Sequence, residues 1–268
     1  MKPTSPKAEV DLSLPILSGD RMISVSVVLP TFREKDSISP MLCALDALDL
    51  PGLEIIVADD HSPDGTEDAA LETAKTMRTP VRVEQNPGVR GLAPSVVHVF
   101  SKAQGDILVC MDADGQHRPE DLPGLLAEFD RDPALSMVVG SRHVPGGGFT
   151  EKWNLFRVIC SDGAAFAARL LLGVKLKDPM SGFFAIRREA FDHVKPCLSP
   201  EGFKIMLELA FLLSLTGRDR VLEHPITFAM RKQGESKLSG RVIVQYLAML
   251  MRFVRTKRAI RRRLAAQN

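Results

Sequence analysis

Short runs of β-branched and other apolar residues recur about every 25 to 30 residues along the first 141 residues of this 268-residue chain. The runs are 23–29, 53–59, 81–85, 106–112 and 136–141. Segments with the apolar spacing of helices lie between them, at 36–49, 66–78, 93–104 and 119–130. This alternation predicts an α/β fold, in which a mostly parallel sheet is flanked by helices on both faces.

The rhythm changes after residue 145, where three consecutive glycines predict a flexible loop. The elements expected beyond it are helices over 153–172 and 203–216, a strand near 220–228, a basic loop at 231–240 and a last helix. We therefore expect three regions: a flexible arm at 1–22, one domain at 23–240, and a basic amphipathic helix at 241–268.

Positive charge is concentrated at the C-terminus, although the net charge of the whole chain is only +2. So small a net charge gives no support for nucleic-acid binding. Seven Lys or Arg and no acidic residue lie between Arg252 and Arg263, after the apolar stretch 242–254. This pattern is typical of a helix that lies in a membrane interface with its basic end against anionic headgroups. Packing on the domain with a solvated basic tail is the alternative.

The expected compartment follows from what the sequence lacks. No stretch reaches the roughly 18 apolar residues of a spanning helix, and the N-terminus lacks the apolar core of a signal peptide. Four widely spaced cysteines favour a reducing compartment and give no support for structural zinc. We expect a cytoplasmic protein that is peripherally associated with the cytoplasmic face of a membrane.

Acidic residues follow three of the predicted strands, within 31–34, 59–62 and 112–116, at the edge where open α/β sheets bind ligands. Asp112 and Asp114 are one residue apart at a strand end, so both carboxylates can reach one Mg²⁺ or Mn²⁺. Asp59 and Asp60 end an earlier strand, where a carboxylate can accept a hydrogen bond from the ring N–H of uracil or guanine. Turn or helix-cap roles are the alternative for both pairs, and we expect the turn after Asp59 to hold Asp60 in place.

Basic residues that could bind phosphates are scattered over the second half of the chain. They are Arg142, Arg157, Lys204, Arg231 and Lys232. Arginine forks pair well with phosphate oxygens, although a solvated surface role is the alternative for each of them. The motifs of dinucleotide-binding folds, P-loops, zinc hydrolases and serine esterases are missing, and the scattered histidines are expected to be structural.

Eight sequence blocks resemble those of dolichyl-phosphate mannosyltransferases, in the same order. They are VSVVLPTFREKDSI, IIVADDHSPDGT, RGLAPSVVHVF, GDILVCMDADGQH, VVGSR, DPMSGFFAIRREAF, GFKIMLELA and RKQGESKL. These enzymes are family 2 glycosyltransferases with the GT-A fold, and the similarity covers about residues 23–255. The resemblance implies a Rossmann-like, mostly parallel sheet with amphipathic interfacial helices at the C-terminus.

The resemblance also implies roles for particular residues. The nucleoside would be held by Pro30, Phe32, Glu34 and Asp60. The donor and a divalent cation (Mg²⁺ or Mn²⁺) would be bound by Asp112, Ala113, Asp114 and Gln116, with Asp112, Asp114 and Gln116 as metal ligands. The donor phosphates would be contacted by Arg142, Lys204, Arg231 and Ser236, and the acceptor phosphate by Arg157. The residues closest to the chemistry would be Asp114, Arg142 and Arg157.

The implied reaction is inverting transfer of mannose from GDP-mannose to a polyprenyl (dolichyl-type) monophosphate at a membrane, where a membrane-anchored partner protein could assist. A phosphate monoester is largely dianionic at neutral pH and needs no general base, so Glu208 is expected to pack its helix or contact sugar. Two departures from the family pattern are His61 and Asp162.

Three other functions compete with this interpretation. Within the same class, the chain could transfer glucose or another sugar from a UDP donor to undecaprenyl phosphate. A nucleotide-sugar-binding regulator without turnover and a nucleotidyltransferase are the alternatives from other classes. The intact acidic and basic residues argue against the regulator, and the segment TFREKD (31–36) after the first strand argues against the nucleotidyltransferase.

Overall fold

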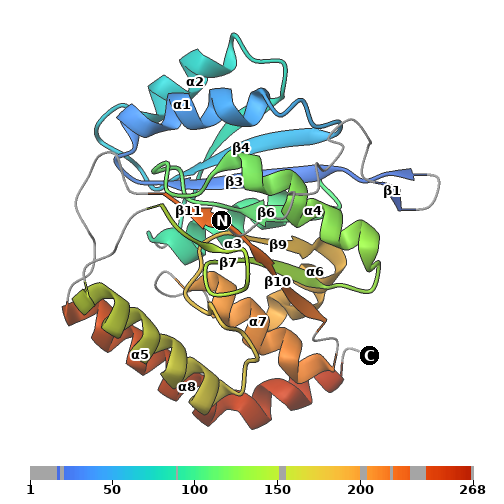
Figure 1. The fold of residues 1–268 in the computed structure, drawn as a ribbon, viewed down its shortest axis with the longest axis vertical. Coiled ribbons are helices and arrows are strands. Elements are labelled where there is room, and N and C mark those ends of the chain that lie inside the picture. The colour runs from blue at the N-terminus through green and yellow to red at the C-terminus, as the bar shows by residue number, and fades with distance from the viewer. Residues whose placement is uncertain are drawn as a thin grey trace, which may run out of the picture.

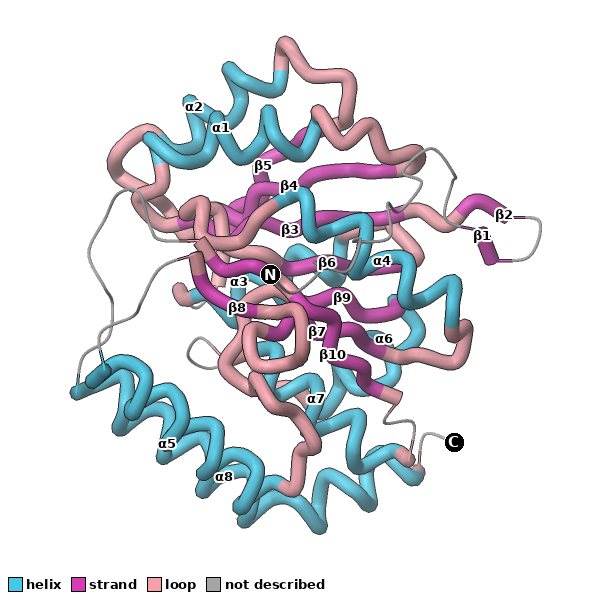
Figure 2. Tube along the Cα trace, viewed as in Figure 1, coloured by secondary structure: helices cyan, strands magenta, loops and turns pink. Residues whose placement is uncertain are grey.

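The computed structural model describes residues 17–18, 21–88, 90–150, 155–199, 204–217, 220–229 and 240–266. Its centre is a seven-stranded sheet with the strand order β10-β7-β9-β6-β3-β4-β5 (Figures 1 and 2). The strands are β3 (Val25–Thr31), β4 (Leu53–Asp59), β5 (Val81–Gln85), β6 (Ile107–Cys110), β7 (Met137–Ser141), β9 (Phe184–Arg187) and β10 (Val221–Pro225). Only β9 is antiparallel to its neighbours, so the predicted mostly parallel sheet is confirmed.

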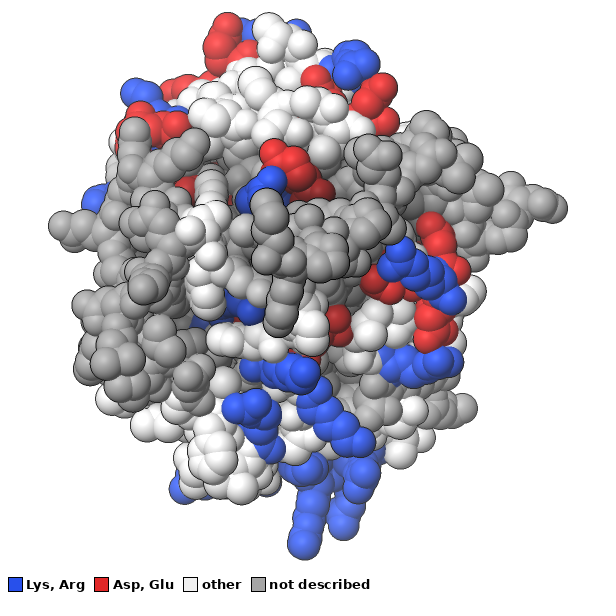
Figure 3. All heavy atoms as spheres, in the orientation of Figure 1, with Lys and Arg blue, Asp and Glu red and all other residues white. Residues whose placement is uncertain are grey.

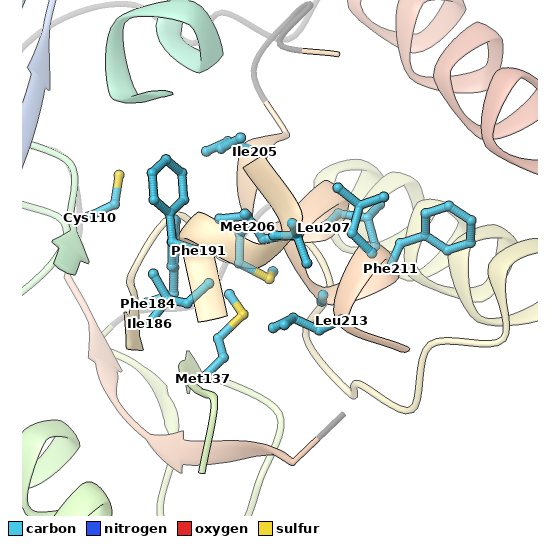
Figure 4. Close-up of a cluster of buried hydrophobic side chains, with 14 of the residues drawn as sticks. Cys110, Met137, Phe184, Ile186, Phe191, Ile205, Met206, Leu207, Phe211 and Leu213 are labelled. Carbon is cyan, nitrogen blue, oxygen red and sulfur yellow. The ribbon is translucent and has the colours of Figure 1, made fainter. Parts of the chain in front are cut away.

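Helices cover both faces of the sheet, as the near-continuous apolar strands predict. They are α1 (Lys35–Asp46), α2 (Thr66–Ala74), α3 (Leu92–Lys102), α4 (Leu122–Arg131), α5 (Leu155–Leu172), α6 (Arg188–Val194), α7 (Ile205–Thr216) and α8 (Gly240–Ala265), with 3-10 turns η1 (Pro119–Asp121) and η2 (Lys195–Cys197). Alternate residues of β6 enter two different cores: Leu108 packs with residues of α3, α6 and α7, whereas Val109 packs with residues of α1 and α4. The first core is drawn in Figure 4.

Two elements near the middle of the chain do not follow from the apolar periodicity. β9 lies between β6 and β7, antiparallel to both, and α6 follows it directly. The predicted strand near 220–228 divides at Ile226 into β10 and a short strand, β11 (Thr227–Phe228). β11 pairs in parallel with β8 (Gly148–Phe149), inside the segment that the glycines mark as a loop.

The predicted N-terminal arm contains a small piece of regular structure. β1 (Leu17–Ser18) and β2 (Arg21–Met22) form an antiparallel pair in which Leu17 lies opposite Met22. Residues 1–16 lie outside the described part of the chain. The boundaries that divide the chain into an arm, a domain and a terminal helix stay predictions.

The last helix packs on the domain along one of its faces. Phe253 of α8 stacks on Phe211 of α7 with ring centroids 5.0 Å apart, and the Tyr246 hydroxyl donates to the Ala164 carbonyl of α5 at 2.7 Å. α5 and α8 consequently run side by side (Figures 1 and 2). Among the described residues, no helix combines the length and the apolar character needed to cross a membrane.

Candidate active site

The residues predicted to bind donor and metal gather beyond the carboxyl ends of strands that run in one direction. The turns after β3, β4, β6 and β7 carry most of them, because these strands all point toward the same edge of the sheet. Lys204 joins them as the residue that precedes α7. Arg231 and Ser236 lie outside the described residues, as do the side chains of Arg157 and Asp162 on α5.

The two acids after β4 differ sharply in their hydrogen bonding. The Asp59 carboxylate accepts hydrogen bonds from the Thr31 hydroxyl at 2.9 Å, from the Ser62 N–H at 2.8 Å and from the Ser62 hydroxyl at 2.6 Å. Asp59 is 1% exposed and its hydrogen bonds hold the turn. The next residue, Asp60, is anchored by its backbone N–H to the Thr31 carbonyl, yet its Oδ1 is buried and has no hydrogen-bond partner within the described part of the chain.

The other residues expected around the nucleoside lie on the adjoining turn. Phe32 exposes its ring, with the Arg33 guanidinium carbon 5.4 Å from the ring centre. The Glu34 carboxylate accepts a hydrogen bond from the Ser37 hydroxyl at 2.7 Å, and its backbone N–H donates to Thr66 Oγ1. Pro30 is the penultimate residue of β3. Phe32 and Glu34 therefore lie on a segment that backbone hydrogen bonds to Ser62 and Thr66 hold against the turn after β4.

His61, one of the departures from the family pattern, fits the turn for a local reason. Its φ of 56° places it in the left-handed region, where Asn, Asp and His are the more common non-glycine residues. Its Nε2 lies 3.0 Å from the Asn86 carbonyl oxygen. His61 therefore ties the turn after β4 to the segment that follows β5.

The second acidic pair lies on a tight turn after β6. Asp114 is 7% exposed and accepts the Gln116 N–H at 3.0 Å, while Gly115 adopts a φ of 77°. The Asp112 side chain is 36% exposed. Gln116 is fixed at both ends, because its carbonyl accepts the Ala229 N–H at 2.8 Å and its amide nitrogen donates to the Ala229 carbonyl at 3.4 Å. Ala113 is buried between the two acids.

The side chain of His117 contacts the backbone of Asp112, the first of these two acids. The Asp112 backbone N–H donates to His117 Nδ1 at 2.9 Å, so this nitrogen acts as an acceptor. Burial lowers the pKa of His117 against the opposing charges of Asp112 and Asp114, which is consistent with a neutral ring. The ring packs against Phe183 and Phe228, with centroids 5.4 and 5.2 Å away. The expectation of a structural histidine fits this placement, although no local pattern marks its bond to Asp112.

A glycine lets a second loop approach the same carboxylate. A Cβ on Gly182 would lie 2.9 Å from Asp112 Oδ2 and 3.2 Å from its Oδ1, closer than side chains normally pack. Gly182 belongs to the segment 178–183, which directly precedes β9. The position of β9 in the sheet therefore brings this segment against Asp112.

Asp178 is the site residue that sequence reasoning missed. The Arg142 guanidinium binds it with both branches, Nε to Oδ2 and an Nη to Oδ1, each at 2.7 Å, and the side chains are 7% and 1% exposed. Burial alone would raise the pKa of Asp178, but the hydrogen bonds and charge of Arg142 outweigh it and lower this pKa. The rings of Phe149 and Phe228 lie 5.5 and 5.0 Å from the guanidinium. That Arg142 contacts donor phosphates stays a prediction.

Lys204 completes the polar cluster. Its ammonium donates to the Met180 carbonyl at 3.4 Å, within the same 178–183 segment. Burial lowers the pKa of Lys204 to about 8, while the charges of Asp112 and Asp178 act in the opposite direction. Four segments of the fold thus place two carboxylates, a guanidinium and an ammonium within electrostatic reach of one another.

The acids after β6 suit a hard divalent cation. No group of three or more His, Cys, Asp or Glu side chains that could hold a metal occurs in the described part of the chain. Mg²⁺ is commonly held by one or two carboxylates together with water and substrate phosphates, so a richer protein cage is not required. Asp112, Asp114 and the amide oxygen of Gln116 supply the right kind of donor atoms.

The chain is similar to enzymes from all three domains of life. Residues 26–195 match the model of "Glycosyl transferase family 2". The dolichol-phosphate mannosyltransferase of Saccharomyces cerevisiae is 40% identical over 85% of this chain and 86% of the yeast protein. That of Pyrococcus furiosus is 38% identical over 87% of this chain, which spans only 64% of the archaeal protein. The undecaprenyl-phosphate mannosyltransferase of Micrococcus luteus is 33% identical over 85% of this chain and 93% of that protein.

A solved structure with a similar fold is glucosyl-3-phosphoglycerate synthase from Mycobacterium tuberculosis, in complex with Mn²⁺, UDP-glucose and phosphoglyceric acid. It matches with a TM-score of 0.65 and 23% identity, over 85% of this chain and 79% of that one. This likeness concerns the fold alone. The chain belongs to glycosyl transferase family 2, in the group of dolichol- and polyprenol-phosphate mannosyltransferases, and its sheet is of the GT-A type.

Proposed function

We propose that this chain transfers mannose from GDP-mannose to a polyprenyl monophosphate, with inversion at the anomeric carbon. The names of the yeast, archaeal and bacterial relatives support the sugar and the lipid class. In the reaction, a phosphate oxygen of the lipid forms a bond to the anomeric carbon while the bond to the GDP oxygen breaks. The products are a lipid-linked mannosyl phosphate and GDP.

The turn after β4 is the proposed binding site of the nucleobase. A buried carboxylate oxygen without a partner is costly, because it has lost water and gained no hydrogen bond in return. Asp60 Oδ1 is such an atom in the part of the chain that the structure describes, and a guanine ring offers the N–H donor that would satisfy it. Phe32, Glu34 and Pro30 would enclose the rest of the nucleoside.

The turn after β6 is the proposed seat of the diphosphate. Asp112, Asp114 and Gln116 would hold a divalent cation, and this cation would neutralise charge on the departing diphosphate. Lys204, Arg231 and Ser236 would contact the phosphates, and Arg142 would either join them or position the loop through Asp178. Catalysis would then rest on positioning and on charge stabilisation rather than on proton transfer.

The acceptor needs no general base, since its phosphate oxygen is already ionised near neutral pH. Arg157 on α5 would bind this phosphate. Glu208 is only 2% exposed and accepts a hydrogen bond from the Ser199 N–H at 2.7 Å, which supports a packing role rather than proton removal.

The proposed lipid substrate requires contact with a membrane, and one surface of the chain suits that contact. Of the ten large apolar residues that are exposed in the described part, seven lie on two helices: Phe166, Leu170 and Leu171 on α5, and Val244, Leu247, Met251 and Val254 on α8. The basic half of α8 follows, and Lys and Arg side chains gather over the lower part of the face in Figure 3. Insertion of the apolar residues and attraction to anionic headgroups would act together.

A peripheral position on the cytoplasmic face of the membrane follows from this proposal, with a membrane-anchored partner protein as a further proposed component. The observation that carries the function is the meeting of Asp112, the Arg142–Asp178 pair and Lys204 at one strand edge.

The test incubates purified protein with vesicles containing polyprenyl phosphate, Mg²⁺ or Mn²⁺, and radiolabelled nucleotide sugars. We expect label from GDP-mannose to become extractable into organic solvent, and Asp114→Ala to lower this rate by about 10³-fold, since loss of a metal ligand removes several kcal/mol of charge stabilisation. Label from UDP-glucose alone would move the assignment to the UDP-sugar alternative. Binding of GDP-mannose without any metal-dependent turnover would contradict the proposed transfer.

A further inference from the structure

The side chain of His117 closes the turn that carries the two acids after β6, and the proposed chemistry gives it no part. The Asp112 backbone N–H donates to His117 Nδ1 at 2.9 Å, whereas the same nitrogen is 3.6 Å from Asp112 Oδ2. A neutral imidazole has one donor and one acceptor nitrogen, so this bond identifies Nδ1 as the acceptor. Asp112 is therefore anchored by its backbone rather than by its carboxylate, which is 36% exposed.

The ring of His117 is itself held on several sides. It is 2% exposed, and the rings of Phe183 and Phe228 lie with their centroids 5.4 and 5.2 Å from its own. Gly182 packs so closely against it that an added Cβ would lie 3.2 Å from His117 Cε1. Side chains packed at this density have little room to shift. The acceptor that meets the Asp112 N–H consequently has a fixed position.

The strand that carries Phe228 also holds the other end of the turn. The residue after Phe228 is Ala229, whose N–H donates to the Gln116 carbonyl at 2.8 Å and whose carbonyl accepts the Gln116 amide nitrogen at 3.4 Å. The Thr227 N–H, one residue earlier on β11, donates to the Asp121 carboxylate at 3.0 Å. Both ends of the turn thus rest against the same strand, through the ring of His117 and the backbone of Gln116.

We propose that His117 is a positioning residue for the cation: its Nδ1 fixes the backbone of Asp112 and thereby the direction of the carboxylate that binds the metal. This inference rests on the proposed function, which places a divalent cation on Asp112. Without the acceptor, the Asp112 N–H loses its partner and the start of the turn can shift. Groups that hold metal ligands in place commonly change metal affinity about 10- to 100-fold when they are mutated.

The experiment measures the GDP affinity of the full chain by calorimetry, at saturating Mn²⁺ and without metal, and takes the ratio of the two affinities. This ratio reports the contribution of the cation to nucleotide binding, because contacts to the nucleobase enter both measurements. His117→Leu places an apolar side chain between Phe183 and Phe228 and offers no acceptor. We expect it to lower the ratio about tenfold.

His117→Asn is the matched control. Its side chain has as many heavy atoms as that of leucine, and its Oδ1 is bonded to Cγ as Nδ1 is in histidine, so it can accept the Asp112 N–H. Both variants lack the ring, and the difference between them reports the acceptor alone. We expect the ratio for His117→Asn to stay within about threefold of wild type, which a role of the ring in packing alone would not produce.

Thermal unfolding in metal-free buffer shows whether each variant is folded. If His117→Leu is not, Phe228→Leu replaces it, because it keeps Nδ1 and removes one of the rings that hold His117 in place. We expect Phe228→Leu to lower the ratio about threefold, less than direct loss of the acceptor. A ratio equal to that of wild type would contradict the inference.

Two further results would overturn it in different ways. Equal ratios in wild type and His117→Leu, or an equal fall in His117→Leu and His117→Asn, would remove the positioning role and leave the proposed function standing. If the GDP affinity of the wild-type chain did not depend on Mn²⁺, the proposed cation site would fall first, and the positioning role would fall with it.

Discussion

Two pairs of acids end strands of the same sheet, and the fold uses them differently. After β4, the Asp59 carboxylate accepts hydrogen bonds from Thr31 and Ser62, whereas Asp60 has a buried oxygen without a partner in the described structure. After β6, Asp114 accepts the Gln116 N–H within the turn, whereas Asp112 lies within electrostatic reach of Lys204 and His117. Asp59 holds the turn after β4 and Asp60 is proposed to bind the nucleobase, while both acids after β6 are proposed to bind the cation.

Because Asp59 and Asp60 differ in their hydrogen bonds, adjacent and identical residues cannot be assigned the same role from their spacing alone. In the turn after β4, His61 adopts a left-handed conformation and Ser62 donates to Asp59. The geometry of this turn decides which of the two acids holds it. In the turn after β6, Gly115 adopts the left-handed conformation instead, and Ala229 holds Gln116 through a backbone hydrogen bond. Three measurements test this contrast.

The largest expected effect is on stability and comes from Asp59. Asp59→Ala removes the acceptor of three hydrogen bonds at a 1% exposed position, which leaves the partners buried and unsatisfied. We expect the free energy of unfolding to fall by ~2–4 kcal/mol. Urea unfolding followed by circular dichroism measures it. An unfolding midpoint equal to that of wild type would mean that the turn does not depend on Asp59.

The neighbouring change should act on binding alone. Asp60→Ala removes a carboxylate oxygen that has no partner among the described residues, so the free energy of unfolding is expected to stay within ~0.5 kcal/mol of wild type. GDP affinity is expected to fall about 10- to 100-fold, the usual value of a hydrogen bond to a charged group. Calorimetry on both variants compares them directly. If Asp60→Ala lost as much stability as Asp59→Ala, the division of roles within the first pair would be wrong.

The smallest effect is a pH dependence at the second pair. Lys204 has a pKa of about 8, so below this pH its ammonium is present to attract phosphates, and above it the charge is lost. GDP affinity, measured without added metal, is therefore expected to fall as the pH rises above about 8. The bound diphosphate raises the pKa of Lys204, and the affinity should stop falling above this higher pKa. Between the two pKa values we expect about a tenfold loss of affinity for each pH unit.

Lys204→Arg provides the control for this profile, because an arginine stays protonated across the whole range. Its GDP affinity is expected to be independent of pH between about 7.5 and about 9, a range that spans the Lys204 pKa of about 8 and lies below the ionisation of the guanine ring N–H. A wild-type profile as flat as that of Lys204→Arg would show that the lysine does not reach the donor.

Much of the fold could be predicted because it depends on local patterns. Five apolar runs became β3, β4, β5, β6 and β7, and the helices between them fall within a few residues of their expected bounds. β9 could not be found in this way. It has only four residues, and its antiparallel place between β6 and β7 depends on partners far away in the sequence rather than on any period of its own.

The same physical limit applies to the site. Residues that directly follow strands, such as Asp60, Asp112 and Asp114, could be selected from position alone, and the structure gathers them at the expected edge. Asp178 was missed because the arginine that it binds is 36 residues away, and no local pattern marks that pairing. The roles of Arg157, Arg231 and Ser236 stay predictions, since their side chains lie outside the described residues.

The place of β9 has a consequence for biosynthesis. β6 and β7 leave the ribosome well before β9, and they cannot pair with each other in the final order because β9 separates them. Each therefore has an unpaired edge at least until residue 184, the first residue of β9, has been made. Unpaired strand edges can pair with other chains. Since the segment carrying Asp178 and Gly182 is set by β9, the nascent chain closes the gap between β6 and β7 and brings Asp178 to Arg142 in the same event, before Lys204 joins the cluster.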